Sequence, residues 1–442
     1  MARIHRRKLL QVSGAGAVAA ASGGLAAILA TGRAPAYAQG TTVHWLRWND
    51  FVPGSDKVLR EQIIPAAAKD LGITLNIEMI NGNDIQARTT AAIQSGSGPD
   101  VICALNNWPQ LYADSMADVS DVAEKIGKEQ GGFYKESIAV GNNGKKWLGV
   151  PWCILGNENA YRKSWFEAVG FTKFPETWDD YRAAGKKLKA KGQPLGQAMG
   201  HSFGDPPTFF YPYLWSWGGK EVEKDGKTVA LNSKETVESV KFWTAFWKEC
   251  CDEGGLAWDD SSNNRAFLAS TISSTLNGAS IYIEAKRKPD SYSADIPGMP
   301  LWQDILHGAL PKGPAGQFSY QLPMTNMLMG YSKQQKAARD FLAWITSKPI
   351  YQVWFNSQQG YSVGATTVWE DDPIWKNDPV MALFRQAGRS GQFPGYAGAA
   401  DRKAGEVMSK YVIVDMYAKA VQGMPAEDAV KLATLELQKI YV

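Results

Sequence analysis

The chain has 442 residues, of which 45% are hydrophobic and 21% are charged, and this composition excludes a disordered, collagen-like or disulfide-scaffold protein. At about 100 to 200 residues per domain, the length predicts two domains, each with its own core. Five of the 47 basic residues lie within residues 1–38, so the rest of the chain carries a net charge of about −2. A nucleic acid or an acidic membrane surface is therefore not an expected partner.

The first 38 residues have the pattern of a cleaved export signal. A basic head, Arg6-Arg7-Lys8, precedes a weakly apolar run over 9–31, and Ala36 and Ala38 fit an A-x-A cleavage site before Gln39. The paired arginines and the Gly/Ala-rich core favour the twin-arginine route to the periplasm. A membrane anchor is the alternative, although serines and glycines dilute this run below the usual apolarity of a spanning helix.

Strand-like and helix-like segments alternate from residue 42 onward. Apolar β-branched runs predict strands over 43–48, 74–80 and 101–105, and helical spacing predicts helices over 57–71 and 85–95. This order is typical of βαβ units in a largely parallel sheet, in which ligands bind beyond the carboxyl ends of the strands. Three polar segments are thereby expected at that edge: 49–50, 81–84 and 106–108.

A second α/β block follows from residue 160. It contains a predicted helix over 233–251 and a strand at 275–276, and a further apolar strand over 324–330 precedes a helix over 334–346. The last part of the chain is predicted to be helical, with loops near 371–379 and 392–400.

Four cysteines, Cys103, Cys153, Cys250 and Cys251, lack C-x-x-C spacing, and no cysteine stands at the cleavage site. This argues against a structural metal site and a lipid anchor. Cys103 and Cys153 lie in apolar strands, which predicts two buried free thiols. A disulfide between them in an oxidising periplasm is the alternative.

Four segments together resemble the bacterial extracellular solute-binding proteins of ABC importers, in particular the carbohydrate-type family that includes maltose-binding protein. They are 91–101 (AAIQSGSGPDV), 144–152 (GKKWLGVPW) continuing to 161–166 (YRKSWF), 174–181 (FPETWDDY) and 332–347 (SKQQKAARDFLAWITS). In the third, Thr177 fits a helix N-cap, with Asp179 and Asp180 in the first turn.

The resemblance implies an α/β fold with two lobes, hinge crossings near 151–154, 306–311 and 360, and a ligand cleft between the lobes. The first lobe would comprise 39–150 plus 312–360, and the second 151–311 plus 361–442. The implied function is a periplasmic, monomeric, non-enzymatic receptor that captures a small polar solute by hinge closure and delivers it to the permease subunits of an ABC transporter. A sugar or oligosaccharide fits best, and no cofactor or metal is expected.

A sugar site needs aromatic plates together with polar side chains that exchange hydrogen bonds with hydroxyls. The first-lobe candidates are Trp48, Asn49, Asp50, Asn107 and Trp108 at strand ends, together with Asn326 on the late strand. The candidates in the second lobe are Glu158, Tyr211, Trp215, Trp217, Asn277 and Tyr282. Each also has a structural interpretation: strand-end polar residues serve as caps, half of the aromatic run 206–217 would pack in the core, and Glu158 could pair with Arg162.

The chain departs from the family after Asn277-Gly278, where many relatives carry an aromatic residue and this chain has Ala279. The stacking ring is then either missing or moved to Tyr282. The sugar identity of a relative therefore does not transfer to this chain.

A secreted carbohydrate-active hydrolase is the alternative function. Residues 200–204 (GHSFG) fit the G-x-S-x-G nucleophile elbow, but Asp205-Pro206-Pro207 follows and is not expected to begin the required helix at once. His307 would be the only downstream histidine available as a base. The acidic clusters at 179–180, 259–260 and 370–372 are interpreted as solvated caps and turns rather than as the facing carboxylates of a glycosidase.

Overall fold

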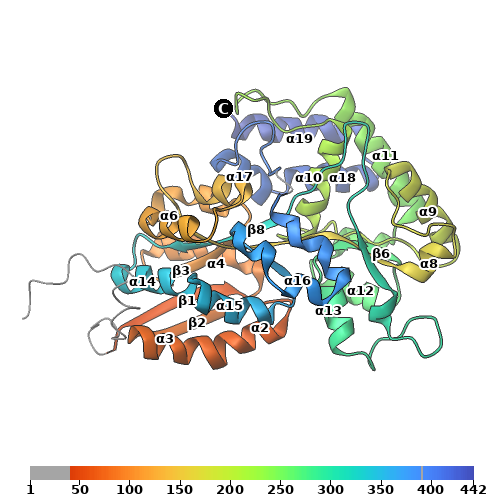
Figure 1. The fold of residues 1–442 in the computed structure, drawn as a ribbon. Helices are drawn as coiled ribbons and strands as arrows, with labels where there is room; N and C mark the ends of the chain where they lie inside the picture. Colours follow the sequence, from red (N-terminus) through yellow and green to blue (C-terminus); the bar gives the residue numbers. More distant parts are fainter. Residues whose placement is uncertain (1–39, 390–391) are drawn as a thin grey trace, which may run out of the picture.

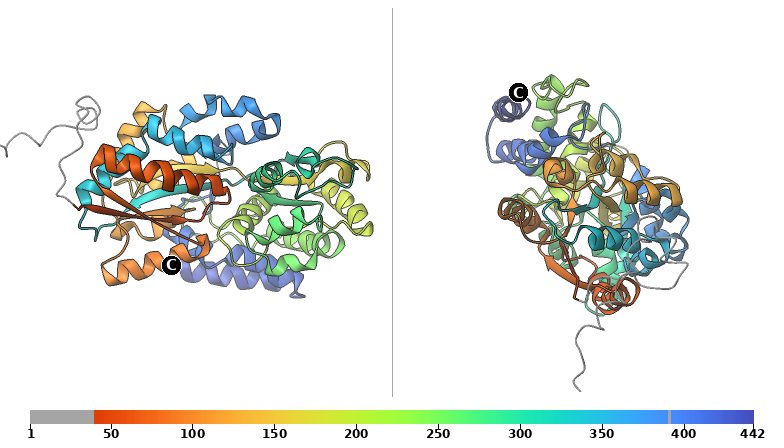
Figure 2. Two further views of the ribbon diagram at one scale, coloured as in Figure 1. Left: turned by 90° about the horizontal axis from the view of Figure 1, so that it is seen from below. Right: turned by 90° about the vertical axis from the view of Figure 1, so that its left-hand side faces the viewer.

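The computed structural model describes residues 40–389 and 392–442, so the predicted signal peptide lies outside the described residues. Two sheets, each covered by helices, form two lobes that lie side by side (Figures 1 and 2). This is the predicted two-lobed α/β architecture. Within the described part of the chain, no helix combines the length and the apolarity needed to cross a membrane.

The first sheet has six strands in the order β2-β1-β3-β8-β4-β9. Their bounds are β2 (Thr74–Ile80), β1 (Thr42–Trp48), β3 (Val101–Leu105), β8 (Leu322–Leu328), β4 (Val150–Leu155) and β9 (Ser362–Gly364). The three predicted N-terminal strands are confirmed, and β1 is parallel to both β2 and β3. However, β8 runs antiparallel to β3 and β4, because the chain re-enters this sheet from the second lobe at the edge where β3 ends.

The second sheet has three strands in the order β6-β5-β7: β6 (Ser274–Asn277), β5 (Glu158–Arg162) and β7 (Ile305–Gly308). The central strand β5 is antiparallel to both neighbours. The expected pairing of Glu158 with Arg162 does not form, because these residues lie in a strand rather than a helix. Arg162 instead pairs with Asp304, with 3.0 Å between Nε and Oδ2.

Helices cover both sheets (Figure 1). Those early in the chain and around the first sheet are α2 (Pro53–Val58), η1 (Leu59–Ile63), α3 (Ile64–Leu71), α4 (Gly82–Ser95), α5 (Trp108–Leu111), η2 (Ala113–Ser115), α6 (Ser120–Glu129), α7 (Lys135–Gly141), α14 (Gln335–Ile345), α15 (Lys348–Ser357), η5 (Thr367–Asp371), α16 (Ile374–Asn377) and η6 (Pro379–Arg389). Those of the second lobe and the C-terminus are α8 (Lys163–Glu167), α9 (Trp178–Ala190), α10 (Asp205–Trp217), α11 (Lys234–Cys250), η3 (Glu253–Ala257), α12 (Ser262–Leu268), α13 (Ser280–Arg287), η4 (Leu301–Asp304), α17 (Arg402–Ser409), α18 (Val412–Val421) and α19 (Ala426–Ile440).

Local signals in the sequence are realised in these helices. Thr177 caps α9, since its Oγ1 accepts a hydrogen bond from the amide of Asp180 at 3.1 Å. The apolar residues at helical spacing in α14, Ala337, Ala338, Phe341, Leu342 and Ile345, are all buried, and Phe341 packs edge-on against Trp45 of β1 with 5.5 Å between ring centroids. The helical period therefore buries one face of α14 against the first sheet.

Helix α10 corrects one expectation from the sequence. It begins at Asp205, directly after the G-x-S-x-G segment, although two prolines follow. Prolines are tolerated there because the first helical turn leaves its N–H groups without intrahelical partners. The aromatic run is thus helical, and all of it up to Ser216 is buried.

The sheets also locate the chain crossings. Strands β4 and β9 both belong to the first sheet, so residues 150–155 and 362–364 pack with the first lobe, a few residues beyond the expected boundaries. The C-terminal helices α18 and α19 pack into the core of the second lobe, whereas α17 also contacts α5 of the first.

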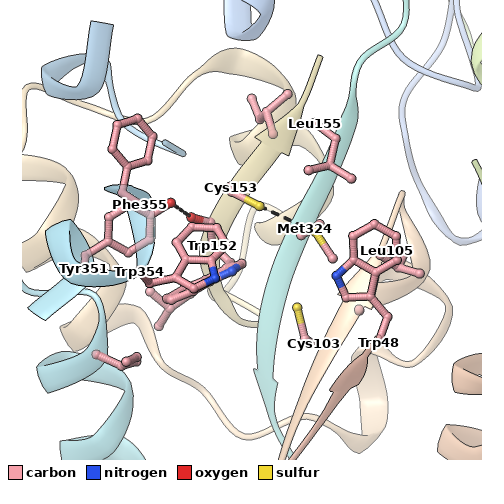
Figure 3. Close-up of a cluster of buried hydrophobic side chains, with 14 of the residues drawn as sticks. Trp48, Cys103, Leu105, Trp152, Cys153, Leu155, Met324, Tyr351, Trp354 and Phe355 are labelled. Carbon is pink, nitrogen blue, oxygen red and sulfur yellow. Dashed lines mark hydrogen bonds between the residues drawn. The ribbon is translucent and has the colours of Figure 1, made fainter. Parts of the chain in front are cut away.

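The four cysteines are free and buried. Cys103 of β3 pairs with Asn326 of β8, and Cys153 of β4 pairs with Met324 of β8, so one strand separates the two thiols (Figure 3). Residues two strands apart lie about 9 to 10 Å from each other, beyond the Cα separation that a disulfide spans. The Cys103–Cys153 disulfide left open by the sequence is therefore absent.

Candidate functional site

Two adjoining cavities lie between the lobes at the carboxyl ends of β1 and β2. The outer cavity has a volume of about 180 Å³ and the inner one of about 20 Å³, the latter about the space of a single water. The outer cavity is lined by Trp48, Asn49, Asp50, Phe51, Asn81, Gly82, Asn83, Phe203, Asp259, Asp260 and Ser261. The inner cavity is lined by Trp48, Phe51, Leu155, Asn157, Phe203, Gly204, Asp205, Asp260, Asn277, Gly278, Ser280, Leu322 and Tyr361.

Phe203 joins the two walls. It comes from the second-lobe loop before α10, and its ring meets the ring of Trp48 edge-on at 5.6 Å between centroids. Its amide donates to Asn83 Oδ1 at 3.1 Å, and its carbonyl accepts from Asn106 Nδ2 at 2.9 Å. First-lobe side chains thus hold the backbone and the ring of a second-lobe residue.

Gly82, the first residue of α4, makes room for this ring. A Cβ at this position would lie 2.2 Å from Phe203 Cε1, which no real contact permits. A side chain at this position would therefore displace the Phe203 ring from its place between the lobes.

Asp50 organises the first-lobe wall. Its carboxylate accepts hydrogen bonds from the Val52 amide, from Ser55 Oγ at 2.8 Å and from Gln358 Nε2 at 2.8 Å. Arg47 Nη2 lies 3.5 Å from Asp50 Oδ2. These contacts fix the start of α2, so Asp50 lines the outer cavity with most of its acceptor sites in use.

Two buried aspartates form the second-lobe wall. Asp260 accepts from the Asp205 amide at 2.7 Å, from the Gly204 amide at 3.1 Å and from Ser202 Oγ at 2.8 Å. Burial raises the pKa of Asp260 to about 6, and burial together with the charge of Asp260 raises the pKa of Asp205 well above its ordinary value. Asp260 is therefore a buried cap of α10, and the expectation of a solvated acid at 259–260 is wrong for this residue because the α10 N-terminus supplies its donors.

Four of the predicted ligand residues line the cavities: Trp48, Asn49, Asp50 and Asn277. Asn277 also accepts a hydrogen bond from Ser280 Oγ and donates one to Asn264 Oδ1. These four come from two distant parts of the sequence and meet because β1 and β6 end on facing sides of the cleft.

The remaining first-lobe candidates lie off these cavities. Asn107 and Trp108 are buried at the start of α5, where the Asn107 side chain has no hydrogen-bond partner within the described chain. Asn326 sits in the middle of β8, and its Oδ1 accepts from Trp45 Nε1 at 3.0 Å. The neighbour Asn106 is the residue of this rim that reaches the interlobe contact.

The second-lobe aromatic candidates also lie elsewhere. Trp215 is 1% exposed and donates from Nε1 to Glu221 Oε2 at 3.1 Å, while Tyr211 is buried beside it. Trp217 packs against Phe242, and the Tyr282 hydroxyl donates to Asp378 Oδ2 at 2.7 Å. These contacts are typical of core packing.

Glu158 is a distinct case. Its side chain is buried at the start of β5, directly opposite Asn277, and forms no hydrogen bond or ion pair within the described chain. Burial raises its pKa to about 8. The group is therefore a buried carboxyl that holds its proton at neutral pH.

Sequence reasoning missed Phe51, Phe203, Tyr361 and Asp260 as cavity residues. The segment 81–84 was expected at the rim, and Asn81, Gly82 and Asn83 do line the outer cavity. No spacing signal marks Phe203 or Tyr361, because the loop before α10 and the segment before β9 reach the cleft only through the packing of whole lobes.

The geometry does not assemble a hydrolase. The segment before Ser202 is not a strand, and the Ser202 hydroxyl donates to Asp260 rather than to a histidine. His307 lies in β7 beside Phe384, and burial lowers its pKa to about 3. Among the described residues, no group of three or more His, Cys, Asp or Glu side chains is placed to hold a metal ion.

A larger hollow, of about 290 Å³, lies between α18 and α19 and is lined by residues such as Lys410, Met416 and Ala433. It contains none of the predicted ligand residues. The interlobe cavities are the better candidate site because they unite aromatic and polar groups from both lobes.

Residues 62–382 match the family model of bacterial extracellular solute-binding proteins. The chain belongs to this family. Its members are binding proteins without catalytic activity, as the sequence predicted for this chain, and the hydrolase alternative has no support.

Relatives and solved structures agree with this membership. Two proteins described as binding proteins, from Brucella abortus (strain 2308) and Brucella suis biovar 1, are each 25% identical to this solute-binding protein over 189 residues. These matches span 42% of this chain and 44% of each relative, so this chain aligns with less than half the length of those relatives.

The fold of this solute-binding protein is shared with two solved proteins. The maltose-bound MalE3 of T. maritima has a TM-score of 0.76 at 19% identity, covering 90% of this chain and 100% of its own. A ribitol-bound ABC transporter solute-binding protein from Agrobacterium radiobacter K84 has a TM-score of 0.73 at 18% identity, covering 91% of this chain and 99% of its own. At these identities, the similarity establishes the two-lobed fold.

Proposed function

We propose that this protein is the exported receptor of an ABC import system. It captures a sugar or another small polyhydroxylated solute between its lobes by hinge closure and presents the closed form to the permease subunits. The observation that carries this proposal is a cleft in which each lobe supplies both aromatic rings and hydrogen-bonding side chains. Membership in the solute-binding family and a fold shared with maltose-bound and ribitol-bound proteins support it.

The crossing segments support a hinge. The chain passes from the first sheet to the second between β4 and β5, at Gly156 and Asn157, and returns between β7 and β8. The Asn157 amide donates to the Gln321 side chain, so the two crossings are tied to each other beside the inner cavity. A movement of one lobe about these crossings would open the cavities without unfolding either sheet.

The residues proposed to contact the solute are Trp48, Asn49 and Asp50 from the first lobe and Asn277 from the second, joined by Phe203 and Tyr361. Their rings would face the apolar side of a sugar, and their amides and carboxylates would exchange hydrogen bonds with its hydroxyls. Residues 1–38 are proposed to direct export to the periplasm by the twin-arginine route, where the receptor acts as a monomer.

A thermal-shift screen against monosaccharides, disaccharides, polyols and amino acids tests this function, followed by calorimetry on each hit. A ligand that binds only the native state stabilises it by about 2.7 kcal/mol at a hundredfold excess over its Kd. We expect a clear rise in Tm with a few related sugars or polyols and no chemical change in them. A rise with amino acids alone would discard the carbohydrate assignment, and conversion of a ligand to product would overturn the receptor role.

A further inference from the structure

The charges around the cleft are unbalanced. The described side chains that line the two cavities include four aspartates and no lysine, arginine or histidine. Asp50 has Arg47 at 3.5 Å, and Asp259 has Arg265 at 3.9 Å. Asp205 and Asp260 form no ion pair within the described chain, so the deepest acids of the cleft have no counter-charge.

These two acids are buried against each other. Asp205 is 5% exposed and Asp260 is 6% exposed, and the amide of the first bonds the carboxylate of the second. Their remaining donors are neutral: Ser202 Oγ, the Gly204 amide, and the Nδ2 atoms of Asn263 and Asn277. Neutral donors orient a carboxylate but add no positive charge, and buried charges in proteins are normally paired.

Tyr361 is an independent sign of a ligand at this place. It is 4% exposed and lines the inner cavity, with its ring stacked near Trp48 at 6.5 Å between centroids. Its hydroxyl forms no hydrogen bond with any described residue, so it is available to bond a group in the cavity. Burial, and then the charges of Asp50, Asp205 and Asp260, raise the pKa of this hydroxyl, which places it among those carboxylates.

The other walls are aromatic. Trp48, Phe51 and Phe203 line both cavities, so a ligand group facing the two acids would be flanked by ring faces and edges. Aromatic faces attract ammonium groups when water is displaced. A neutral hydroxyl could donate one hydrogen bond here but would not offset the negative charge of Asp260, whose pKa of about 6 leaves it ionised at neutral pH.

We infer that the solute captured in this cleft carries a protonated amine, which lies against Asp205 and Asp260 with the Tyr361 hydroxyl beside it. This inference rests on the proposed receptor function and names the solute class: an amine-bearing polyhydroxylated compound rather than a neutral one. The amine would supply the counter-charge that the described chain lacks at this point.

Charge-matched probes test the inference on the unmodified protein. Calorimetry at pH 7 compares D-glucosamine with D-glucose and 1-amino-1-deoxy-D-sorbitol with D-sorbitol. We expect the amine of at least one pair to bind at least tenfold more tightly than its neutral partner. Equal or tighter binding of the neutral partners, or no binding of either amine, would overturn the inference.

Two variants test whether the preference for the amine arises at Asp205. Asp205→Asn keeps the shape of the side chain and should reduce the preference for the amine to less than threefold. Asp179→Asn is the matched control, since Asp179 is exposed in the first turn of α9 of the same lobe and lines neither cavity, and it should keep the preference. A preference that survives Asp205→Asn in a folded protein would contradict the placement of the amine.

The outcomes separate the two proposals. Binding of neutral sugars or polyols without any gain from an amine keeps the receptor function and discards the amine. Absence of binding by every compound, neutral or charged, in both this test and the wider screen would count against the receptor function itself.

Discussion

Removal of the Phe203 ring should open the two lobes. This ring is 5% exposed, and its contacts lie on the opposite lobe: the Trp48 ring at 5.6 Å and the space above Gly82. In the Phe203→Ala variant, the closed arrangement loses this contact, whereas an open arrangement has little to lose because the ring would then face solvent.

The size of the effect follows from the buried ring. Full burial of a Phe side chain contributes about 1.5 to 3 kcal/mol, and an edge-to-face aromatic pair adds about 0.5 to 1.5 kcal/mol. The closed arrangement should therefore be destabilised by about 2 to 4.5 kcal/mol, a shift of roughly 30- to 1,600-fold in the opening equilibrium. Solute affinity should fall, because closure around the solute costs correspondingly more.

Small-angle X-ray scattering of the purified protein without added solute measures the opening directly. We expect a larger radius of gyration for Phe203→Ala than for the unmodified protein. Phe133→Ala is the matched control, because Phe133 packs against Trp147 within the first lobe at 5.2 Å and does not span the cleft. Its scattering profile should be unchanged.

Gly82→Ala tests the same contact from the other side. The added Cβ would lie 2.2 Å from Phe203 Cε1, so the ring must move, although alanine favours the helix itself. We expect opening similar to that of Phe203→Ala. Identical scattering of the unmodified protein and both variants would refute the reasoning that this contact holds the lobes together.

Four further predictions follow from buried groups. In the unmodified protein, the native Glu158 carboxyl has a pKa of about 8 and keeps a proton that the unfolded chain releases near pH 4.3, so the free energy of unfolding falls as pH rises from 5 to 8. Glu158→Gln removes this dependence and should therefore gain stability relative to the unmodified protein over this range, by an amount on the order of a few kcal/mol in pH-dependent unfolding. Tyr361→Phe should weaken solute binding by about 2- to 10-fold in calorimetry without lowering Tm, because the lost hydroxyl has no protein partner among the described residues. Trp215→Ala should cost about 3 to 5 kcal/mol in thermal unfolding, since the ring is buried and bonded to Glu221. Mass spectrometry without reductant should find Cys103 and Cys153 as free thiols.

Each of these four predictions has an outcome that would contradict it. A parallel pH dependence of the unmodified protein and Glu158→Gln would show that this carboxyl is ionised in the native state. A large loss of Tm in Tyr361→Phe would mean that its hydroxyl bonds within the protein. An unchanged Tm in Trp215→Ala would place that ring outside the core, and a mass lower by two hydrogens would reveal a disulfide.

The sequence determined the elements and the family. The spacing of apolar residues alone located β1, β2, β3 and α14 to within a few residues. It does so because the strands are buried within the sheet and the helix buries one apolar face against it. The order of motifs, from the Pro-Asp-Val strand to the late helix at 332–347, indicated a two-lobed solute-binding protein. The strand ends at 48–50 and Asn277 were found as cavity residues because strand ends in such sheets lie at the binding edge.

Tertiary structure alone decided the rest of the site. The aromatic run 206–217 is locally indistinguishable from a loop of stacking rings, and only its position in the core of the second lobe shows that it is structural. Phe203, Tyr361 and the Asp205–Asp260 pair reach the cleft from segments with no spacing signal. Their meeting depends on how the two lobes approach each other, and this relation between distant surfaces is not encoded in any local pattern of residues.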